Sequence, residues 1–271
     1  MKKFTTIVSV MLVSFSFFGL QIKAQQIAPP NATNLEEQNT MSVLWFQKSG
    51  EAKALYYQGY NIGKMRLDEI LKSKKYGLKP AIVLDIDETI VDNSPYLAWN
   101  VQTRKKFDVN WNQWVQKAES RALPGALAFL KYADSKGVAI YYISNRQEAQ
   151  KVATIKVLHQ IGAPQANSKH VLLQQPGEIG KEIRRAKVAA THDIVLLFGD
   201  NLNDFSGFDG LSVSGRIQAV DRRKDEFGKK LIVFPNPMYG DWEGAIYNYN
   251  EKKSDSEKAK LRKESLEVVQ P

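Results

Sequence analysis

Apolar runs of strand length alternate with segments of helical periodicity along most of the chain. Strand-like runs lie at 81–84, 138–143, 171–173 and 194–198. Helical spacing of apolar residues is found at 41–71, 126–135, 148–160 and 181–190. Because the longer runs do not alternate apolar with polar residues, they are typical of strands buried on both faces. The pattern therefore predicts an α/β fold with a mostly parallel sheet.

Shorter signals complete this prediction. Two further segments, 217–220 and 231–234, are expected to close the sheet. Ser49 is expected to cap the long helix that follows it. Gly59 and Gly63 lie one helical turn apart, and we expect a neighbouring helix to approach closely there.

Polar residues directly follow three of the predicted strands. They are Asp85 and Asp87 after the first, Ser144, Asn145 and Arg146 after the second, and Asp200 and Asp204 after the third. An Asp-x-Asp pair by itself would also fit a strand that runs into a turn. Because open parallel sheets bind ligands at the carboxyl ends of their strands, the three clusters together predict one site.

The predicted site is rich in carboxylates. Asp85, Asp87, Asp200 and Asp204 would repel one another unless a cation compensates their charge. Oxygen ligands without neighbouring His or Cys favour Mg²⁺ over zinc. Such a site suits phosphoryl transfer, in which cationic or hydroxyl groups contact the remaining phosphoryl oxygens.

The first 24 residues have the charged, apolar and cleavage regions of a secretory signal peptide. A membrane anchor is the alternative. However, the apolar run at 7–20 contains three serines, and a span needs about 20 apolar residues. Residues 25–40, with two adjacent prolines, are predicted to be a linker, 41–255 the folded domain, and 256–271 a charged tail.

Composition excludes several classes of protein. The chain has no cysteine, which rules out disulfides, lipid attachment at a cysteine and a cysteine nucleophile. Its three histidines are isolated in the sequence, which argues against a histidine-rich metal site. Loss of residues 1–24 would lower the net charge from +9 to +6. This modest basic charge favours anionic partners, but no basic stretch indicates binding of a nucleic-acid polymer.

Longer motifs carry a resemblance to a known family. The strings D-I-D-E-T-I, S-N-R, a helical lysine and G-D-N-L-N-D resemble the four motifs of the haloacid dehalogenase (HAD) superfamily. Further strings, D-N-S-P-Y, P-G-A and P-N-P-M-Y-G-D-W-E, resemble the class C non-specific acid phosphatases of bacterial envelopes, and the likeness extends over residues 43–243. It implies a HAD-like Rossmannoid sheet flanked by helices, with a small helical cap at about residues 93–123.

The resemblance also implies roles for the catalytic residues. Asp85 would be the nucleophile that forms an aspartyl-phosphate. Asp87 would protonate the leaving alcohol and then deprotonate the attacking water, with an acid pH optimum as the consequence. Ser144 would bind a phosphoryl oxygen, and Lys181 would neutralise charge.

The metal and substrate contacts follow from the same likeness. Mg²⁺ would be bound by the carboxylates of Asp85 and Asp200 and the backbone carbonyl of Asp87, with Asp204 in support. Substrates would be small phosphomonoesters, often 5′-nucleotides. The residues assigned to substrate binding are Asn145, Arg146, Trp111 and Tyr239. Trp111 and Tyr239 would sandwich a base, although a role in the hydrophobic core is the alternative for Trp111.

Two departures from the family pattern affect these expectations. Many members carry a lipid-attachment cysteine, and its absence here favours a free periplasmic or secreted protein. The segment 174–180 lacks the usual lysines and serines, so Lys187 remains the alternative to Lys181. Homodimers are expected by analogy alone.

Two other functions remain open at this point. One is a sugar-phosphate phosphatase of narrow specificity, or a phosphotransferase, with the same chemistry. The other is a non-catalytic surface binding protein on the same fold. Because Asp85, Asp87, Asp200 and Asp204 are all present, the sequence favours an enzyme.

Overall fold

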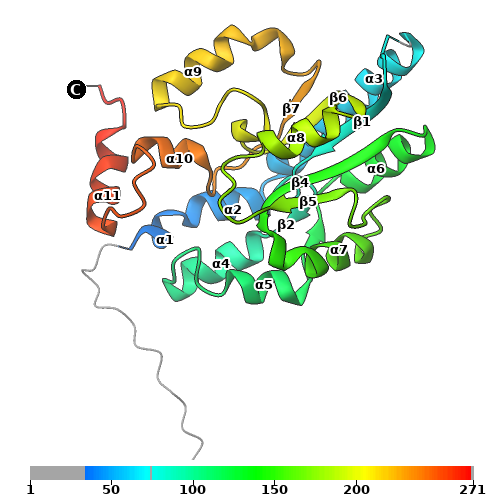
Figure 1. Ribbon diagram of the computed structural model, residues 1–271. Helices are drawn as coiled ribbons and strands as arrows, with labels where there is room; N and C mark the ends of the chain where they lie inside the picture. The colour runs from blue at the N-terminus through cyan, green and yellow to red at the C-terminus, as the bar shows by residue number, and fades with distance from the viewer. Residues whose placement is uncertain (1–33, 74, 270–271) are drawn as a thin grey trace, which may run out of the picture. The chain divides into compact units, whose positions relative to one another are not determined.

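The centre of the fold is a sheet of five parallel strands in the order β5-β4-β1-β6-β7 (Figure 1). The computed structural model describes residues 34–73 and 75–269. The strands of the sheet are β1 (Lys79–Leu84), β4 (Ala139–Gln147), β5 (Val171–Gln174), β6 (His192–Gly199) and β7 (Leu231–Val233). This arrangement confirms the predicted α/β fold with a parallel sheet.

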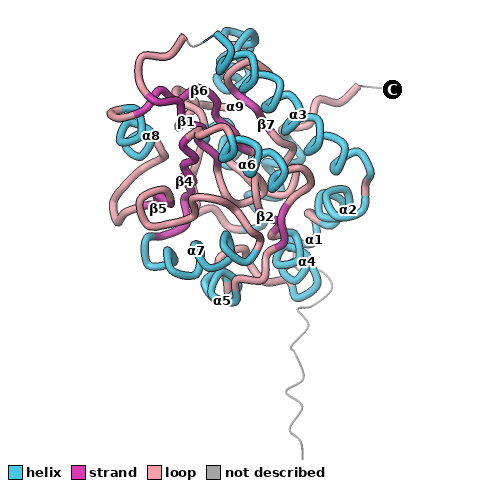
Figure 2. The backbone as a smooth tube through the Cα atoms, turned by 90° about the vertical axis from the view of Figure 1, so that its right-hand side faces the viewer, coloured by secondary structure: helices cyan, strands magenta, loops and turns pink. Residues whose placement is uncertain are grey.

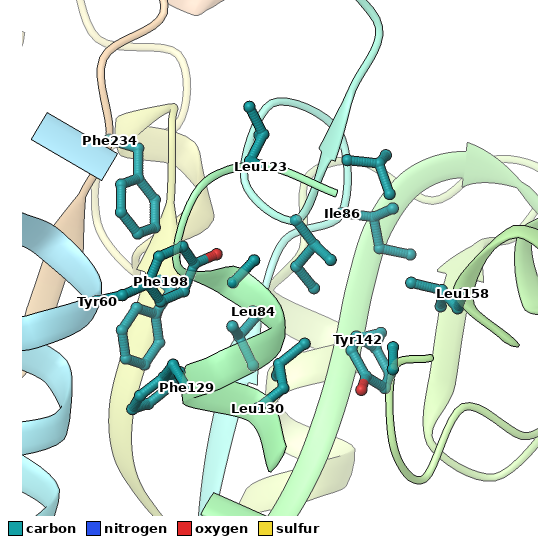
Figure 3. Close-up of a cluster of buried hydrophobic side chains, with 14 of the residues drawn as sticks. Tyr60, Leu84, Ile86, Leu123, Phe129, Leu130, Tyr142, Leu158, Phe198 and Phe234 are labelled. Atoms are coloured by element: carbon teal, nitrogen blue, oxygen red, sulfur yellow. The ribbon is translucent and has the colours of Figure 1, made fainter. Parts of the chain in front are cut away.

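The side chains of strand β1 point alternately into two hydrophobic cores. Ile82 and Leu84 belong to the larger core, and Ala81 and Val83 belong to the smaller one. Successive side chains of a strand point to opposite faces of the sheet, so both faces of β1 are covered. This explains why its sequence is continuously apolar. Figure 3 shows part of the larger core around Leu84.

Helices cover both faces of the sheet (Figure 2). The larger core receives apolar side chains from α3 (Gly50–Ser73), α6 (Ala126–Ser135) and α7 (Lys151–Gln160), and the smaller core from α8 (Glu182–Ala189) and α9 (Val213–Arg222). Short 3-10 helices follow three of the elements: η1 (Glu148–Gln150), η2 (Leu202–Asp204) and η3 (Lys224–Glu226). As expected, the hydroxyl of Ser49 caps α3, because it accepts a hydrogen bond from the amide of Ala52 at 3.0 Å.

A small helical insertion follows β1. It contains α4 (Ser94–Thr103) and α5 (Trp111–Lys117), and a two-stranded antiparallel ribbon of β2 (Val91–Asp92) and β3 (Arg121–Ala122) joins its two ends. The two helices and β3 lie within the segment 93–123 that was expected to be a helical cap, and β2 directly precedes it. The insertion begins directly after the Asp85 loop, so it lies beside the predicted site.

The segment predicted to be a linker is partly folded. Residues 1–33, which include the predicted signal peptide, lie outside the described residues. The helices α1 (Leu35–Gln38) and α2 (Thr40–Lys48) begin before residue 41, so the prediction of a linker up to residue 40 is wrong at its end. The side chain of Asn34 caps α1 by accepting a hydrogen bond from Glu37 N at 2.9 Å, and Leu35 is buried.

The predicted charged tail begins in a helix. Beyond α10 (Asp241–Ile246), the helix α11 (Asp255–Glu264) includes residues 256–264 of the predicted tail 256–271. A capping box of Ser254 and Glu257 starts this helix. Arg262 Nη1 donates to the carbonyl of Leu35 at 3.2 Å, which joins α11 to α1. No helix of the described part of the chain has the length and apolar character needed to cross a bilayer.

One predicted strand is wrong. The run 217–220 lies in helix α9, whereas β7 lies where the run 231–234 predicted it. The hydroxyl of Ser212 caps α9 by accepting a hydrogen bond from Gly215 N at 3.1 Å. Arg216 and Ala219, three positions apart, face inward, while Ile217 is exposed. Four residues, of which Ile217, Ala219 and Val220 are apolar, are too few to distinguish the two periodicities.

The glycines of α3 face aromatic rings: Gly59 faces Phe234, directly after β7, and Gly63 faces Phe198 of β6 and, at 3.5 Å from an added Cβ, Phe129 of the neighbouring helix α6. A helix therefore packs at Gly63 as expected, although the ring of Phe198 is nearer. A Cβ at Gly63 would lie 2.6 Å from Cε1 of Phe198. That ring is in contact with Tyr60 and Phe129, at centroid distances of 5.9 and 4.7 Å. Phe198 therefore has little freedom to move away.

We expect Gly63→Ala to destabilise the protein by about 1–3 kcal/mol, the usual cost of overpacking a core. Gly50→Ala is the matched control in the same helix, because a Cβ at Gly50 meets no atom within 4 Å. Urea denaturation of both variants measures the difference. Equal stability of the two variants would contradict the close packing of Gly63 on Phe198.

Candidate active site

Residues of all the predicted motifs meet at the carboxyl edge of the sheet. Asp85 follows β1, Ser144 lies near the end of β4, and Asp200 follows β6. The amide of Asp85 donates to the carbonyl of Phe198 at 3.0 Å, which fixes the end of β1 against β6. Lys181 comes to this edge as the N-cap residue of α8.

Three carboxylates form a cluster that can hold a metal ion. One oxygen of each of Asp85, Asp200 and Asp204 lies within 4.8 Å of the others. Burial, followed by repulsion from neighbouring carboxylates such as Asp204, raises the pKa of Asp85 well above its usual value, although Lys181 opposes this shift. Burial and Asp204 likewise raise the pKa of Asp200. Burial and mutual repulsion thus both disfavour the ionised forms of Asp85 and Asp200.

Lys181 is the cation of this cluster. Its Nζ donates to Asp85 Oδ1 and, at 2.6 Å, to Asp204 Oδ1. Burial alone would lower the pKa of Lys181, but the attraction of Asp204 and Asp85 is larger and raises it. Lys187, the alternative motif lysine, has an exposed side chain on α8. The geometry therefore selects Lys181 as the lysine that contacts Asp85.

Asp200 has two neutral hydrogen-bond partners. Thr89 Oγ1 donates to its Oδ1 at 3.2 Å, and Asn236 Nδ2 donates to its Oδ2 at 2.8 Å. Neither residue was assigned to the site from the sequence. Both lie inside the motif strings, D-I-D-E-T-I and P-N-P, so only their position in a motif could have indicated a role.

The carboxylate of Asp87 lies apart from the metal-capable cluster and pairs with Arg146. Arg146 Nη2 donates to Asp87 Oδ1 at 2.7 Å, and Nε is 3.0 Å from both oxygens. Ser144 Oγ donates to Asp87 Oδ2 at 3.1 Å, and Asn93 Nδ2 donates to Oδ1 at 2.8 Å. Arg146, predicted to bind substrate, is almost fully buried against Asp87.

These contacts change the protonation of Asp87. Burial alone would raise its pKa, but the charge of Arg146 and hydrogen bonds from Arg146, Asn93 and Ser144 lower it overall. Asp87 is therefore ionised in this arrangement, contrary to the protonated form that an acid catalyst needs. A phosphate dianion bound next to Asp87 would raise its pKa again.

Asn145, also predicted to bind substrate, is bound to an arginine of α8. Its side chain is exposed, and its Oδ1 accepts a hydrogen bond from Arg184 Nη2 at 2.8 Å. Arg184 also donates to the carbonyl of Ser144 at 2.5 Å. The neighbouring Arg185 donates to the carbonyl of Asp204 at 2.9 Å. Helix α8 thus supports two of the motif loops through residues that the motifs did not indicate.

Glu88 is a buried acid that was not assigned to the site. Its carboxylate accepts hydrogen bonds from the hydroxyl of Tyr239 and, at 2.7 Å, from the amide of Asn93. Burial, followed by the charge of Asp87, raises the pKa of Glu88 to about 8. Tyr239 is 151 positions away in the chain, so no local sequence pattern indicates this pair.

Aromatic rings form a wall beside the site. The ring centroid of Phe107 lies 5.1 Å from that of Tyr239 and 5.4 Å from that of Trp111. The guanidinium carbon of Arg146 lies over Trp111, 5.7 Å from the ring centroid. Trp111 also packs against the larger core. Phe107 thus contacts both residues of the expected Trp111–Tyr239 sandwich, and Phe107 was not assigned to the site from the sequence.

The metal-free protein is expected to unfold at lower temperatures as the pH rises from about 5 to about 8. The pKa of Glu88 is raised from 4.5 to about 8. Its contribution to stability is therefore full below the lower value and is lost as the pH approaches the upper one. The raised pKa values of Asp85 and Asp200 act in the same direction, and the lowered pKa of Asp87 acts only at more acid pH.

Thermal unfolding in EDTA across this pH range measures the effect. In Glu88→Gln the melting temperature should depend less on pH, because the residue no longer titrates. A melting temperature that is constant or rises over this range in the wild type would contradict the burial of these acids.

Comparisons with known proteins agree with this geometry. A family model described as HAD superfamily, subfamily IIIB (acid phosphatase), matches residues 3–242. The chain is 59% identical to a class C acid phosphatase from Bacillus anthracis solved with tungstate bound, with a TM-score of 0.86 over 87% of this chain and 99% of that chain. A second structure, of the class C acid phosphatase from Bacillus anthracis, is 58% identical, with a TM-score of 0.85 and the same coverage.

A more distant relative comes from a plant. Acid phosphatase 1 of Solanum lycopersicum is 24% identical over 209 residues, which are 70% of this chain and 74% of that protein. The family model covers far more than half of the chain, and Asp85, Lys181, Asp200 and Asp204 meet in one place in the structure. The chain therefore belongs to the HAD superfamily, subfamily IIIB, and is an acid phosphatase related to the class C enzymes.

Proposed function

We propose that this acid phosphatase hydrolyses small phosphomonoesters in a Mg²⁺-dependent reaction through an aspartyl-phosphate on Asp85. The single observation that carries this proposal is the contact of Lys181 with both Asp85 and Asp204 inside the carboxylate cluster. This contact supports the proposal because Asp85, as nucleophile, would have a charge-neutralising cation and a candidate metal site beside it.

The residues of the cluster fit Mg²⁺. Asp85, Asp200 and Asp204 offer only oxygen atoms, which are the preferred ligands of Mg²⁺. Burial, and then repulsion from neighbouring carboxylates, raises the pKa values of Asp85 and Asp200, and a bound cation would oppose both effects. Asp85, Asp200 and the backbone carbonyl of Asp87 would hold the ion, with Asp204 in support. When bound, Mg²⁺ would neutralise charge on these carboxylates and on the phosphoryl oxygens.

Asp85 acts as the nucleophile, and Asp87 donates and accepts protons. An oxygen of Asp85 attacks phosphorus, the bond from phosphorus to the ester oxygen breaks, and the departing oxygen takes a proton from Asp87. A water molecule then attacks phosphorus, gives its proton to Asp87, and releases phosphate and the free carboxylate of Asp85. Ser144 and Lys181 bind phosphoryl oxygens during both steps.

Substrate selection is assigned to the aromatic wall. Phe107 and Tyr239, with ring centroids 5.1 Å apart, offer faces on which a nucleobase can stack. Such a contact contributes about 1–3 kcal/mol in nucleic-acid binders. Trp111 supports this wall through Phe107. We therefore include 5′-nucleotides among the substrates.

We also propose that the protein is exported to the periplasm or secreted, and that residues 1–24 are removed. The support is the order of charged, apolar and small residues in this segment. Because the chain contains no cysteine, lipid attachment at a mature N-terminal cysteine is not part of the proposal. Mass measurement of protein recovered outside the cytoplasm tests cleavage after Ala24.

The proposed reaction is tested by turnover of p-nitrophenyl phosphate and of 5′-AMP by metal-free protein, before and after addition of Mg²⁺. Activity that is lost in EDTA and restored by Mg²⁺ is expected for both substrates. Full activity in EDTA would contradict the metal requirement. Turnover of p-nitrophenyl phosphate without turnover of 5′-AMP would contradict the nucleotide part alone.

A further inference from the structure

Glu88 lies where the catalytic loop meets the aromatic wall. Its side chain has no exposed surface, and the hydroxyl of Tyr239 and the amide of Asn93 donate to its two carboxylate oxygens. The hydroxyl of Tyr56 donates to its backbone carbonyl. The backbone of Glu88 has a φ of +53°, which non-glycine residues adopt rarely. Contacts on every side therefore hold this residue in an uncommon conformation.

Asn93 connects Glu88 to Asp87, because its backbone amide binds Glu88 and its side chain binds Asp87. Its Oδ1 accepts hydrogen bonds from Trp114 Nε1 and Ser120 Oγ, both at 2.8 Å. Because an indole N–H can only donate, this atom of the amide must be the oxygen. The amide nitrogen then faces Asp87 and donates to its Oδ1 at 2.8 Å.

These contacts form one chain of hydrogen bonds from Tyr239 through Glu88 and Asn93 to Asp87. We propose that Glu88 is a positioning residue that holds Asp87, through Asn93, in the orientation needed for proton transfer, with the hydroxyl of Tyr239 as its second anchor. This inference rests on the proposed role of Asp87 as proton donor. The hydroxyl of Tyr239 would then act in the reaction of every substrate, independently of any stacking of its ring on a nucleobase.

Two substrates with the same ring but different leaving groups separate proton transfer from binding. Phenolate is a much stronger base than p-nitrophenolate, so departure from phenyl phosphate depends far more on a proton donor. The kcat/KM for each substrate reports the first chemical step, before release of phosphate. Misplacement of Asp87 should therefore affect phenyl phosphate much more than p-nitrophenyl phosphate.

Three variants test the chain of contacts. Glu88→Gln keeps the shape of the residue, and Tyr239→Phe keeps the ring. In each, kcat/KM for phenyl phosphate should fall about 10- to 100-fold, as is usual when a group that orients an active-site residue is lost. The fall for p-nitrophenyl phosphate should be much smaller. The double variant should be no worse than the more severe single variant, because both changes act on the same contact.

Tyr247→Phe is the matched control. The hydroxyl of Tyr247 donates to a carboxylate of Glu243 at 2.8 Å and its ring is buried, so the substitution removes the same kind of bond. Among the described residues, the hydroxyl of Tyr247 bonds to Glu243 and Arg262 and not to Asp87, Glu88 or Asn93. Its kcat/KM values for both substrates should equal those of the wild type, and circular dichroism verifies that each variant is folded.

Asp87→Asn distinguishes failure of this inference from failure of the proposed mechanism. If Asp87→Asn lowers kcat/KM equally for both substrates, Asp87 is not the proton donor and the mechanism itself is wrong. If Asp87→Asn affects phenyl phosphate selectively but Glu88→Gln and Tyr239→Phe do not, the positioning role of Glu88 is overturned. A selective loss of kcat/KM for phenyl phosphate in Asp87→Asn, Glu88→Gln and Tyr239→Phe supports the positioning role of Glu88.

Discussion

Asp85→Asn should abolish phosphatase activity, with a loss of kcat on the order of 10⁴- to 10⁶-fold, as for the removal of nucleophiles in other enzymes. An amide cannot replace the carboxylate as a nucleophile, and Lys181 loses one of its two carboxylate partners. The variant should nevertheless fold, because the substitution removes one negative charge from a crowded cluster. Turnover of p-nitrophenyl phosphate in the presence of Mg²⁺ measures the loss.

The control for this substitution is Asp221→Asn, at an exposed position of α9. It changes the charge of the protein equally and should leave kcat unchanged. In EDTA, the melting temperature of Asp85→Asn should be at least that of the wild type at neutral pH. Substantial activity in Asp85→Asn would show that another group attacks phosphorus.

Lys181→Met should impair both activity and stability. The lysine side chain is buried between Asp85 and Asp204, and loss of one partner from a buried ion pair costs about 3–5 kcal/mol because a buried charge is left uncompensated. Loss of a group that stabilises charge in the transition state lowers kcat by about 10²- to 10³-fold. Urea denaturation and turnover of p-nitrophenyl phosphate measure the two effects separately.

Lys187→Met provides a matched control on the same helix. The side chain of Lys187 is exposed, so both stability and kcat should remain close to those of the wild type. If Lys187→Met were the more damaging substitution, the assignment of the motif lysine would be reversed. Equal, small effects of both substitutions would contradict the role of Lys181 in charge neutralisation.

The position of the site could be predicted from the sequence because it follows from topology. Asp85, Ser144 and Asp200 each come after a buried strand, and parallel strands bring their carboxyl ends to one edge. The alternation of strands and helices required a parallel sheet. Location was therefore predictable without knowledge of any side-chain contact.

The partners of each side chain were not predictable in the same way. Arg146 was expected to face substrate but binds Asp87, and Asn145 binds Arg184. Such contacts depend on the conformations of loops, which hydrophobic periodicity does not determine. Glu88 and Tyr239 meet only because the loops after β1 and β7 converge.

Errors in the fold came from segments with weak patterns. The four-residue run 217–220 fits either periodicity, and in the structure it lies in the helix that begins at the Ser212 cap. The polar segment 34–40 resembled a linker, yet one buried leucine and a capping asparagine suffice for a helical turn there. Short helices of this kind depend on tertiary packing more than on their own sequence.

A crystal structure of the protein grown with Mg²⁺ and tungstate tests the central claim most directly, because the heavy atom can be located by its anomalous scattering. The tungsten atom should lie next to Asp85, within reach of Ser144 and Lys181, with the metal ion between Asp85 and Asp200. Tungstate bound away from Asp85, or a metal ion outside the carboxylate cluster, would contradict a mechanism in which Asp85 accepts the phosphoryl group.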